Sequence, residues 1–277
     1  MNNKKLIAID LDGTLLTDNK KIKFSSVLYL KKLERKGNIV LISTGRPPRS
    51  SLCYYNQLKL HGPIITYNGA YIFNPNDANF KSSLYTIKKE AAIDIYDKFI
   101  GKNFDSVLSE TLDTIFVDEE RYFLFTINEI PLDTDKMTLK KGSISQNLNV
   151  DPILFVMHFN KTSKENSDEV IAYVRNKYPY LDIEVWGNGE YGDLHVKNIN
   201  KANSIREIKE KYAIKDDDVI TFGDSVNDLA MINEFKHGYA MKNCNPRIAS
   251  LVNQLTKKDN NHNGVVSTIK EIINSEK

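Results

Sequence analysis

The sequence predicts an α/β fold in which a parallel sheet is flanked by helices and a second α/β domain is inserted into the chain. Three observations support this prediction. Short apolar runs alternate with helix-like stretches from residue 6 to residue 67, the alternation returns from residue 202 to residue 254, and the segment between them has a different pattern. Apolar strands separated by helices indicate parallel pairing, because a parallel pair needs a crossover connection.

The N-terminal part predicts three strands and two helices. Residues 6–10 form a short apolar strand, and residues 24–36 carry apolar side chains at helical spacing up to a glycine. A helix is expected at residues 50–60, between strands at 38–44 and 63–67. These elements assign residues 1–80 to the first part of a core domain.

The middle of the chain, residues 81–195, predicts an independent α/β domain. Its clearest strand is the apolar run at residues 153–159. The other expected elements are helices at residues 88–100, 119–129 and 166–178 and strands at residues 106–108, 114–117 and 182–186. Turn-forming residues 74–77 mark one boundary of this domain, and Gly187–Gly189 lies near the other.

The last part, residues 196–277, is expected to complete the core. Helices are expected at residues 202–212, 228–235 and 246–254, and strands at residues 219–222 and 239–241. The asparagine-rich segment 259–264 is interpreted as an exposed loop. With residues 1–80, this part would form a Rossmann-like parallel-sheet core.

The composition excludes several classes of protein. With 41% hydrophobic and 27% charged residues the chain is expected to fold. Its 38 Lys and Arg against 36 Asp and Glu give a net charge of +2, without the basic excess of a nucleic-acid binder. No apolar stretch approaches the about 18–20 residues that cross a bilayer, and the two cysteines form no disulfide framework. We therefore expect a cytoplasmic protein without membrane or nucleic-acid partners; the sequence does not indicate protein partners.

Two carboxylates follow the first predicted strand. Asp10 ends the strand and Asp12 lies in the next turn, where Gly13 allows a backbone conformation that a side chain would hinder. Ligands of open α/β sheets bind outside the carboxyl ends of strands. Neighbouring carboxylates stay ionised only beside positive charge, and Mg²⁺ is the usual cation next to a phosphate. A calcium loop is excluded because Leu15 and Lys21 occupy its Gly and Glu positions, whereas a solvated acidic turn stays open.

A second acidic cluster follows the predicted strand at residues 219–222. Asp224 is the natural third metal ligand, and Asp228 lies about one helical turn further on. The alternative is a helix start, because Asp, Ser and Asn are favoured there, and one of Ser225 or Asn227 is expected to act as such a cap. Capping does not explain why acidic residues recur at two strand ends.

Two further signals are weak on their own. Ser43-Thr44-Gly45-Arg46 ends the second strand, and its hydroxyl and N–H groups suit a phosphate oxygen, although this is also ordinary turn composition. Lys201 precedes the helix at residues 202–212, and a lone lysine is usually a surface residue. These residues are candidates for a phosphate site only because they occur together with the acidic motifs.

Taken together, these motifs resemble the four motifs of the haloacid-dehalogenase-like superfamily, and more narrowly its Cof-type sugar-phosphatase-like branch. The matching segments are Asp10-x-Asp12-Gly13-Thr14, Thr44-Gly45-Arg46, Lys201, Gly223-Asp224-x-x-Asn227-Asp228, Thr66-Tyr67-Asn68-Gly69-Ala70, Ala240-Met241-Lys242-Asn243 and Asn263-Gly264-Val265. In the superfamily, a domain inserted between the second and third motifs is a cap. The resemblance therefore implies a substrate-selecting cap at residues 81–195.

The resemblance implies a Mg²⁺-dependent phosphatase of small phosphorylated metabolites, with Asp10 as the nucleophile that forms an aspartyl-phosphate. Asp12 would protonate the leaving alkoxide and later activate water. Lys201 would be the third catalytic residue and would contact phosphoryl oxygens. The metal would be held by Asp10, Asp224 and the main-chain carbonyl of Asp12. The phosphate- or substrate-binding residues expected are Leu11, Thr44, Gly45, Arg46, Asn68, Asn227, Asp228 and Asn243.

Substrate selection leaves alternatives open. Trp186, Glu190, Tyr191 and His195 are candidate substrate contacts in the inserted domain, but each also has an ordinary structural explanation. His158, inside an apolar run, is interpreted as a satisfied core histidine. A phosphomutase, which returns the phosphoryl group to a sugar, and a non-catalytic phospho-ligand binder are the other functions considered. The intact acidic set favours an enzyme, since a binder needs no proton-shuttling Asp12.

Overall fold

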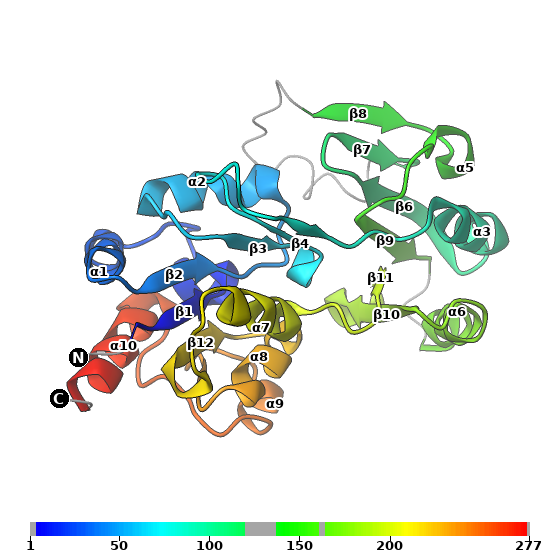
Figure 1. The fold of residues 1–277 in the computed structure, drawn as a ribbon. Coiled ribbons are helices and arrows are strands. Elements are labelled where there is room, and N and C mark those ends of the chain that lie inside the picture. Colours follow the sequence, from blue (N-terminus) through cyan, green and yellow to red (C-terminus); the bar gives the residue numbers. More distant parts are fainter. Residues whose placement is uncertain (1–3, 120–136, 161–163, 276–277) are drawn as a thin grey trace. The chain divides into compact units, whose positions relative to one another are not determined.

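The computed structural model describes residues 4–119, 137–160 and 164–275. The chain divides into two units, which we call unit 1 (Met1–Ser83 and Asn200–Lys277) and unit 2 (Leu84–Ile199). The boundaries expected after residues 80 and 195 fall slightly earlier than these divisions. The predicted α/β class with a parallel-sheet core is confirmed (Figure 1).

The main sheet of unit 1 is parallel and has the strand order β13-β12-β1-β2. Its strands are β1 (Leu6–Ile9), β2 (Ile39–Ile42), β12 (Val219–Gly223) and β13 (His237–Ala240). Ile9 pairs with both Ile42 and Phe222, so the carboxyl ends of β12, β1 and β2 are level. Loops that follow these strands therefore meet at one edge of the sheet.

A smaller sheet consists of β3 (Ile64–Thr66), β4 (Tyr71–Phe73) and β5 (Ser83–Leu84). A parallel bridge between Ser43 and Ile65 places β3 beside the end of β2. The helices of unit 1 are α1 (Phe24–Arg35), α2 (Pro48–Leu58), α7 (Lys201–Lys211), α8 (Leu229–Glu234), α9 (Pro246–Ala249) and α10 (Gly264–Ser275).

These helices cover both faces of the main sheet. Side chains of α1, α2 and α10 pack on one face with Ile7 and Ile9, whereas those of α7, α8 and α9 pack on the other with Leu6 and Ala8. The alternation of neighbouring β1 residues between two cores explains why the whole strand is apolar. Figure 1 shows α1 and α10 on the opposite side of the sheet from α7 and α8.

Three expectations for the C-terminal part are corrected. The helix expected at residues 246–254 ends at Ala249. The segment 259–264 is not an exposed loop, because it contains a helical turn at Asn260–His262 and Asn260 is buried. Helix α10 was not expected, although four of its apolar side chains recur at helical spacing.

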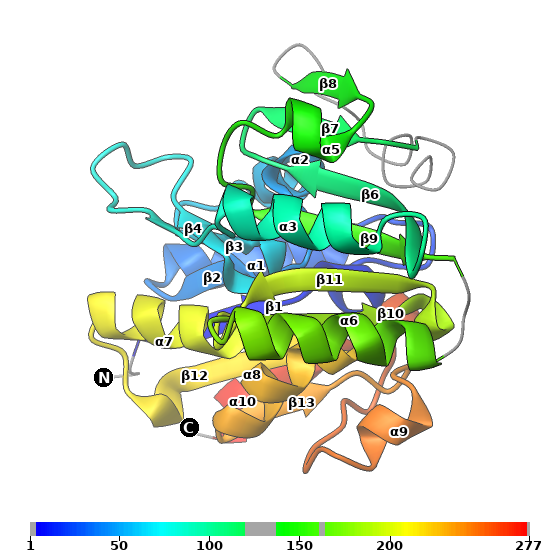
Figure 2. The same cartoon turned by 90° about the vertical axis from the view of Figure 1, so that its right-hand side faces the viewer.

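Unit 2 has a six-stranded sheet of order β10-β11-β9-β6-β7-β8 with helices on one face. Its strands are β6 (Phe104–Glu110), β7 (Thr114–Val117), β8 (Thr138–Lys141), β9 (Leu154–Phe159), β10 (Leu181–Trp186) and β11 (Tyr191–Val196), and its helices are α3 (Lys89–Phe99), α5 (Ile144–Asn147) and α6 (Lys164–Lys177). Figure 2 shows α3 and α6 lying across the same side of these strands.

One prediction for unit 2 differs from the structure, and another lies outside the described residues. Gly187–Gly189, expected near a domain boundary, instead forms the turn between β10 and the unexpected strand β11. The helix expected at residues 119–129 falls almost wholly outside the described residues. Among the residues that the structure describes, no helix is both long enough and apolar enough to cross a membrane.

Candidate active site

Three buried charged side chains meet where the main sheet of unit 1 ends. Asp10 directly follows β1, and its N–H donates to the carbonyl of Phe222 on the neighbouring strand (3.0 Å). Lys201, the first residue of α7, places Nζ 2.8 Å from Asp10 Oδ1 and 2.6 Å from Asp228 Oδ1. Lys201 is only 1% exposed, so this lysine, far from being a surface residue, holds a buried positive charge between two carboxylates.

Both oxygens of the Asp228 carboxylate accept hydrogen bonds. Its Oδ1 accepts the Lys201 ammonium, and its Oδ2 accepts the N–H groups of Asp224 (3.0 Å) and Ser225 (3.1 Å). Asp228 therefore orients both the lysine and the loop after β12. These contacts make Asp228 a positioning group, and its role as a substrate-binding residue stays a prediction.

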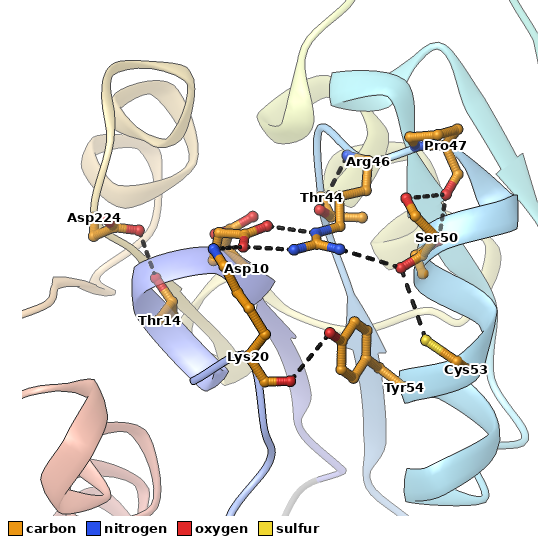
Figure 3. A network of polar contacts seen from close by, with 12 residues as sticks. Asp10, Thr14, Lys20, Thr44, Arg46, Pro47, Ser50, Cys53, Tyr54 and Asp224 are labelled. Atoms are coloured by element: carbon orange, nitrogen blue, oxygen red, sulfur yellow. Dashed lines mark hydrogen bonds and ion pairs between the residues drawn. The ribbon is translucent and has the colours of Figure 1, made fainter. Parts of the chain in front are cut away.

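Asp224 lies against the turn that follows Asp10. Thr14 donates its hydroxyl to Asp224 Oδ1 at 3.0 Å (Figure 3). Gly13 has φ +66°, and a Cβ at this position would lie 2.2 Å from Asp224 Oδ2. Only glycine both adopts this backbone conformation and leaves room for the carboxylate. This contact of Thr14 could not be predicted from its motif alone.

The acidic cluster fits a hard divalent cation. Asp10, Asp224 and Asp228 offer carboxylate oxygens that all lie within 4.8 Å of one another. In the described part of the chain, one oxygen each of Asp10 and Asp224 is occupied by Lys201 and Thr14, and the second accepts no hydrogen bond. Burial raises the pKa of Asp10, and burial with the nearby Asp228 raises the pKa of Asp224 to about 6. A cation would relieve this excess of negative charge.

The side chain of Asp12 is held by two cations. Arg46 donates Nε to Asp12 Oδ2 at 2.5 Å and Nη2 to Oδ1 at 2.7 Å, and Lys20 Nζ lies 2.6 Å from Oδ1. Burial alone would raise the pKa of Asp12, but the hydrogen bonds from Arg46 and Lys20 outweigh it and lower the pKa to about 2. Figure 3 shows both cationic groups directed into the site, with Tyr54 donating its hydroxyl to the Lys20 carbonyl (3.2 Å). The role of Asp12 in proton transfer stays a prediction, and the contact with Lys20 was not predicted from the sequence.

A polar wall forms beside this centre. Thr44 is buried, and its Oγ1 accepts the N–H of Arg46 at 3.1 Å. Asn227 Nδ2 donates to Asn68 Oδ1 at 2.8 Å, and a Cβ on Gly45 would approach that same oxygen to 2.8 Å. Within the described residues, Asn227 Oδ1 is buried without a hydrogen-bond partner. Such an orphaned acceptor is unusual in a folded protein and is consistent with a ligand site.

Two expected binding residues have mainly structural contacts. Asn243 donates Nδ2 to the carbonyl of Gly13 (2.8 Å), and its Oδ1 accepts the N–H of Asn260 (3.0 Å). The side chain of Leu11 is fully buried in the core. Leu11 can therefore offer a ligand only its backbone.

Comparison with known proteins decides the family. Residues 7–269 match the family model of haloacid dehalogenase-like hydrolases. The chain belongs to this family. The predicted resemblance is thus confirmed, and the protein is a hydrolase of this superfamily.

Similar proteins share nearly the full length of this hydrolase. The 5-amino-6-(5-phospho-D-ribitylamino)uracil phosphatase YitU of Bacillus subtilis is 31% identical over 96% of each chain. A Bacillus subtilis phosphatase with the same substrate in its name, YcsE, is 27% identical over 96% of this chain and 94% of its own. A haloacid dehalogenase-like hydrolase from Bacteroides thetaiotaomicron has the same fold, with TM-score 0.80 and 21% identity over 98% of this chain and 100% of its own.

The remaining candidates of this hydrolase lie in unit 2. Trp186 ends β10, Glu190 follows the hairpin turn, and Tyr191 and His195 lie on β11. His158, on β9, contacts Asp105 with a 2.6 Å separation between Nδ1 and Oδ1. The ring of His158 is therefore satisfied, as predicted, but it lies on the strand face opposite Met157 and Phe159 and is not part of the core that those residues form.

Proposed function

We propose that the chain is a Mg²⁺-dependent phosphatase that hydrolyses small phosphate monoesters through an aspartyl-phosphate on Asp10. The arrangement of Asp10 and Lys201 is the observation that supports this proposal most strongly. Asp10 keeps one carboxylate oxygen without a hydrogen bond while a buried ammonium holds the other. A carboxylate fixed in this way can attack phosphorus without first giving up a solvent shell.

In the first half-reaction, the free oxygen of Asp10 forms a bond to phosphorus and the bond to the ester oxygen breaks. Lys201 and the Thr44 hydroxyl stabilise the phosphoryl oxygens. Asp10, Asp224 and the main-chain carbonyl of Asp12 would hold Mg²⁺, which supplies positive charge that offsets the repulsion between nucleophile and phosphate. Water then attacks the acyl phosphate, which releases inorganic phosphate and restores Asp10.

Asp12 is proposed to protonate the leaving alkoxide and later to accept a proton from the attacking water. Its ion pairs with Arg46 and Lys20 favour the carboxylate form and so oppose proton donation. Before Asp12 can act as an acid, Arg46 and Lys20 must therefore form ion pairs with the substrate in place of some of those that they form with the Asp12 carboxylate. A phosphate ester supplies the negative charge for this exchange.

Unit 2 is proposed to be the cap that selects the substrate. Two relatives are named for the same ribitylaminouracil phosphate, which is a phosphate monoester of a small polyol. Their names support a small phosphorylated metabolite as the substrate of this chain. A larger phosphorylated partner, such as a nucleic acid, is disfavoured by the net charge of +2.

The test is a panel of phosphate monoesters, including 5-amino-6-(5-phospho-D-ribitylamino)uracil and ribose 5-phosphate, with phosphate release as the readout. We expect release with Mg²⁺ and none in excess EDTA. Release without a bisphosphate activator separates a phosphatase from a phosphomutase. Retained ligand binding with no release from any ester would instead indicate a non-catalytic binder and would overturn the proposal.

A further inference from the structure

The two cations that hold Asp12 come from different parts of unit 1. Arg46 follows β2, whereas Lys20 lies in a hairpin that is closed by a bridge between Leu16 and Ile22. Arg46 Nε lies 2.5 Å and Lys20 Nζ 2.6 Å from oxygens of the Asp12 carboxylate. Within the described residues, neither cation forms an ion pair with another carboxylate. The pair therefore carries one more positive charge than Asp12 offsets, and this charge suits an anionic ligand.

Tyr54, on helix α2, contacts both of these cationic residues. Its hydroxyl donates to the Lys20 carbonyl at 3.2 Å (Figure 3). The guanidinium carbon of Arg46 lies 5.6 Å from the centroid of the Tyr54 ring, a distance at which an aromatic face attracts a cation. The Ser50 carbonyl, one turn earlier on α2, accepts an N–H of Arg46 at 3.5 Å. One side chain of α2 therefore joins the two cations.

The backbone of Lys20 is strained. Its φ is +55°, in the left-handed region that residues with a side chain rarely adopt. Such a conformation persists only where surrounding contacts hold the chain in place, and it is common at ligand-binding positions. Two residues earlier in the hairpin, the Asp18 carboxylate accepts Nδ2 of Asn260 at 3.0 Å and Nδ2 of Asn261 at 2.8 Å. The hairpin is thus fixed at Asp18 by the C-terminal segment and at Lys20 by Tyr54.

We propose that Tyr54 is a positioning residue that holds Arg46 and Lys20 as one clamp of two positive charges for the phosphate group of the substrate. The inference rests on the proposed phosphatase function and adds to it a residue that acts through the two cations. A lysine side chain that is already ordered binds an anion more tightly than a mobile one, because no rotamer freedom is lost when the anion arrives. A tyrosine that only stabilised the fold would change the free energy of unfolding and leave phosphate affinity unchanged.

Binding of inorganic phosphate tests the clamp without turnover. The full-length protein in excess Mg²⁺ is titrated with phosphate in a calorimeter. Tyr54→Phe removes the hydroxyl but keeps the ring and should raise Kd about threefold, whereas Tyr54→Leu also removes the ring and should raise Kd about tenfold. Tyr55→Phe is the matched control and should leave Kd unchanged, because the hydroxyl of Tyr55, on the same helix, donates to the Gly62 carbonyl at 2.8 Å instead of to Lys20.

A double-mutant cycle separates positioning from a general structural effect. Lys20→Met removes the ammonium but leaves the backbone carbonyl that Tyr54 contacts. If the Tyr54 hydroxyl acts by placing the ammonium, Tyr54→Phe should have no further effect on the phosphate Kd in the Lys20→Met protein. Its effect on Tm should be the same in both backgrounds, since the hydrogen bond to the carbonyl is lost in each.

Three results overturn the inference: no saturable phosphate binding by the wild type, an unchanged Kd in Tyr54→Phe, or the same loss of affinity with and without the Lys20 ammonium. With a phosphate ester as substrate, Tyr54→Phe should lower kcat/KM by the same factor as it lowers phosphate affinity. If no ester releases phosphate, the proposed function fails, whereas the clamp is still judged by the phosphate titrations.

Discussion

The ammonium of Lys201 lies 2.8 Å from Oδ1 of Asp10, although 191 positions separate the two residues in the sequence. This contact joins the end of β1 to the start of α7 and thereby couples the active-site geometry to the folding of both segments. The buried ammonium of Lys201 also explains how the carboxylates of Asp10 and Asp228 can lie close together. Lys201 therefore has a structural role, and the catalytic role that we propose for it can be measured separately.

Replacing Lys201 by methionine should both destabilise and inactivate the protein. The change leaves two buried carboxylates without their cation, and breaking a buried ion pair costs about 3–5 kcal/mol. We expect the free energy of unfolding at pH 7 to fall by about that amount in denaturant titrations. Lys236→Met, which removes an exposed ion pair with Asp217, is the control and should change it by less than about 1 kcal/mol. Equal losses in the free energy of unfolding in the two variants would show that the buried ion pairs of Lys201 contribute no more than the exposed pair.

Gly13→Ala should weaken Mg²⁺ activation specifically. A Cβ there would lie 2.2 Å from Asp224 Oδ2, so the carboxylate must move. Gly37→Ala is a matched control, because Gly37 also has positive φ (+87°) but no atom within 4 Å of the added Cβ. Both variants should lose about 1–2 kcal/mol of stability through backbone strain, but only Gly13→Ala should need about tenfold more Mg²⁺ for half-maximal phosphate release. The same Mg²⁺ requirement in both variants would argue against a metal at Asp224.

Mg²⁺ should stabilise the protein more at pH 8 than at pH 5. The pKa of Asp224 in the metal-free protein is raised to about 6, so this carboxyl binds its proton more tightly in the folded than in the unfolded chain. Its contribution to stability is therefore present below about pH 4 and is lost as the pH rises through about 6. A cation competes with that proton and replaces its effect at higher pH.

Thermal unfolding with Mg²⁺ or with EDTA at both pH values checks this dependence. We expect the Mg²⁺-induced rise in Tm to be larger at pH 8 in the wild type and to be nearly absent in Asp224→Asn. A rise of the same size at both pH values, or one that survives in Asp224→Asn, would be inconsistent with cation binding at this carboxylate.

Asp12→Asn should cut kcat by about 10²–10⁴-fold, the range that proton transfer contributes, because an amide cannot shuttle a proton. Lys20→Met removes only one of the two cations that hold Asp12, and that lysine is largely exposed, so its effect should be a few-fold at most. Steady-state phosphate release at saturating substrate measures both. Near-normal kcat in Asp12→Asn would exclude it as the acid and base.

Much of the core could be predicted because its strands are uninterrupted apolar runs buried on both faces. β1 and β12 differ from their expected ranges by a single residue. Strand β11 was missed because Gly192 weakens its apolar alternation and the preceding turn resembles a domain boundary. Helix α10 could have been found, since Val265, Ile269 and Ile272 recur at helical spacing.

The site was predictable where its residues lie in strand-end motifs and not where it depends on long-range pairing. The motifs indicated Asp10, Asp224 and Lys201, and the parallel register explains why they meet. The sequence does not show that Arg46 reaches Asp12 across 34 positions, or that Lys20 joins it from a hairpin. Such contacts depend on side-chain direction, which periodicity does not encode.

The most direct test of the central claim is to trap the phosphorylated enzyme during turnover. Protein mixed with substrate and Mg²⁺ is quenched in acid, digested and analysed by mass spectrometry. The account predicts one phosphoryl group on the peptide that contains Asp10, lost on treatment with hydroxylamine and absent from Asp10→Asn, which should fold but release no phosphate. Phosphate release that continues in Asp10→Asn, or a phosphoryl group trapped only on another peptide, would contradict it.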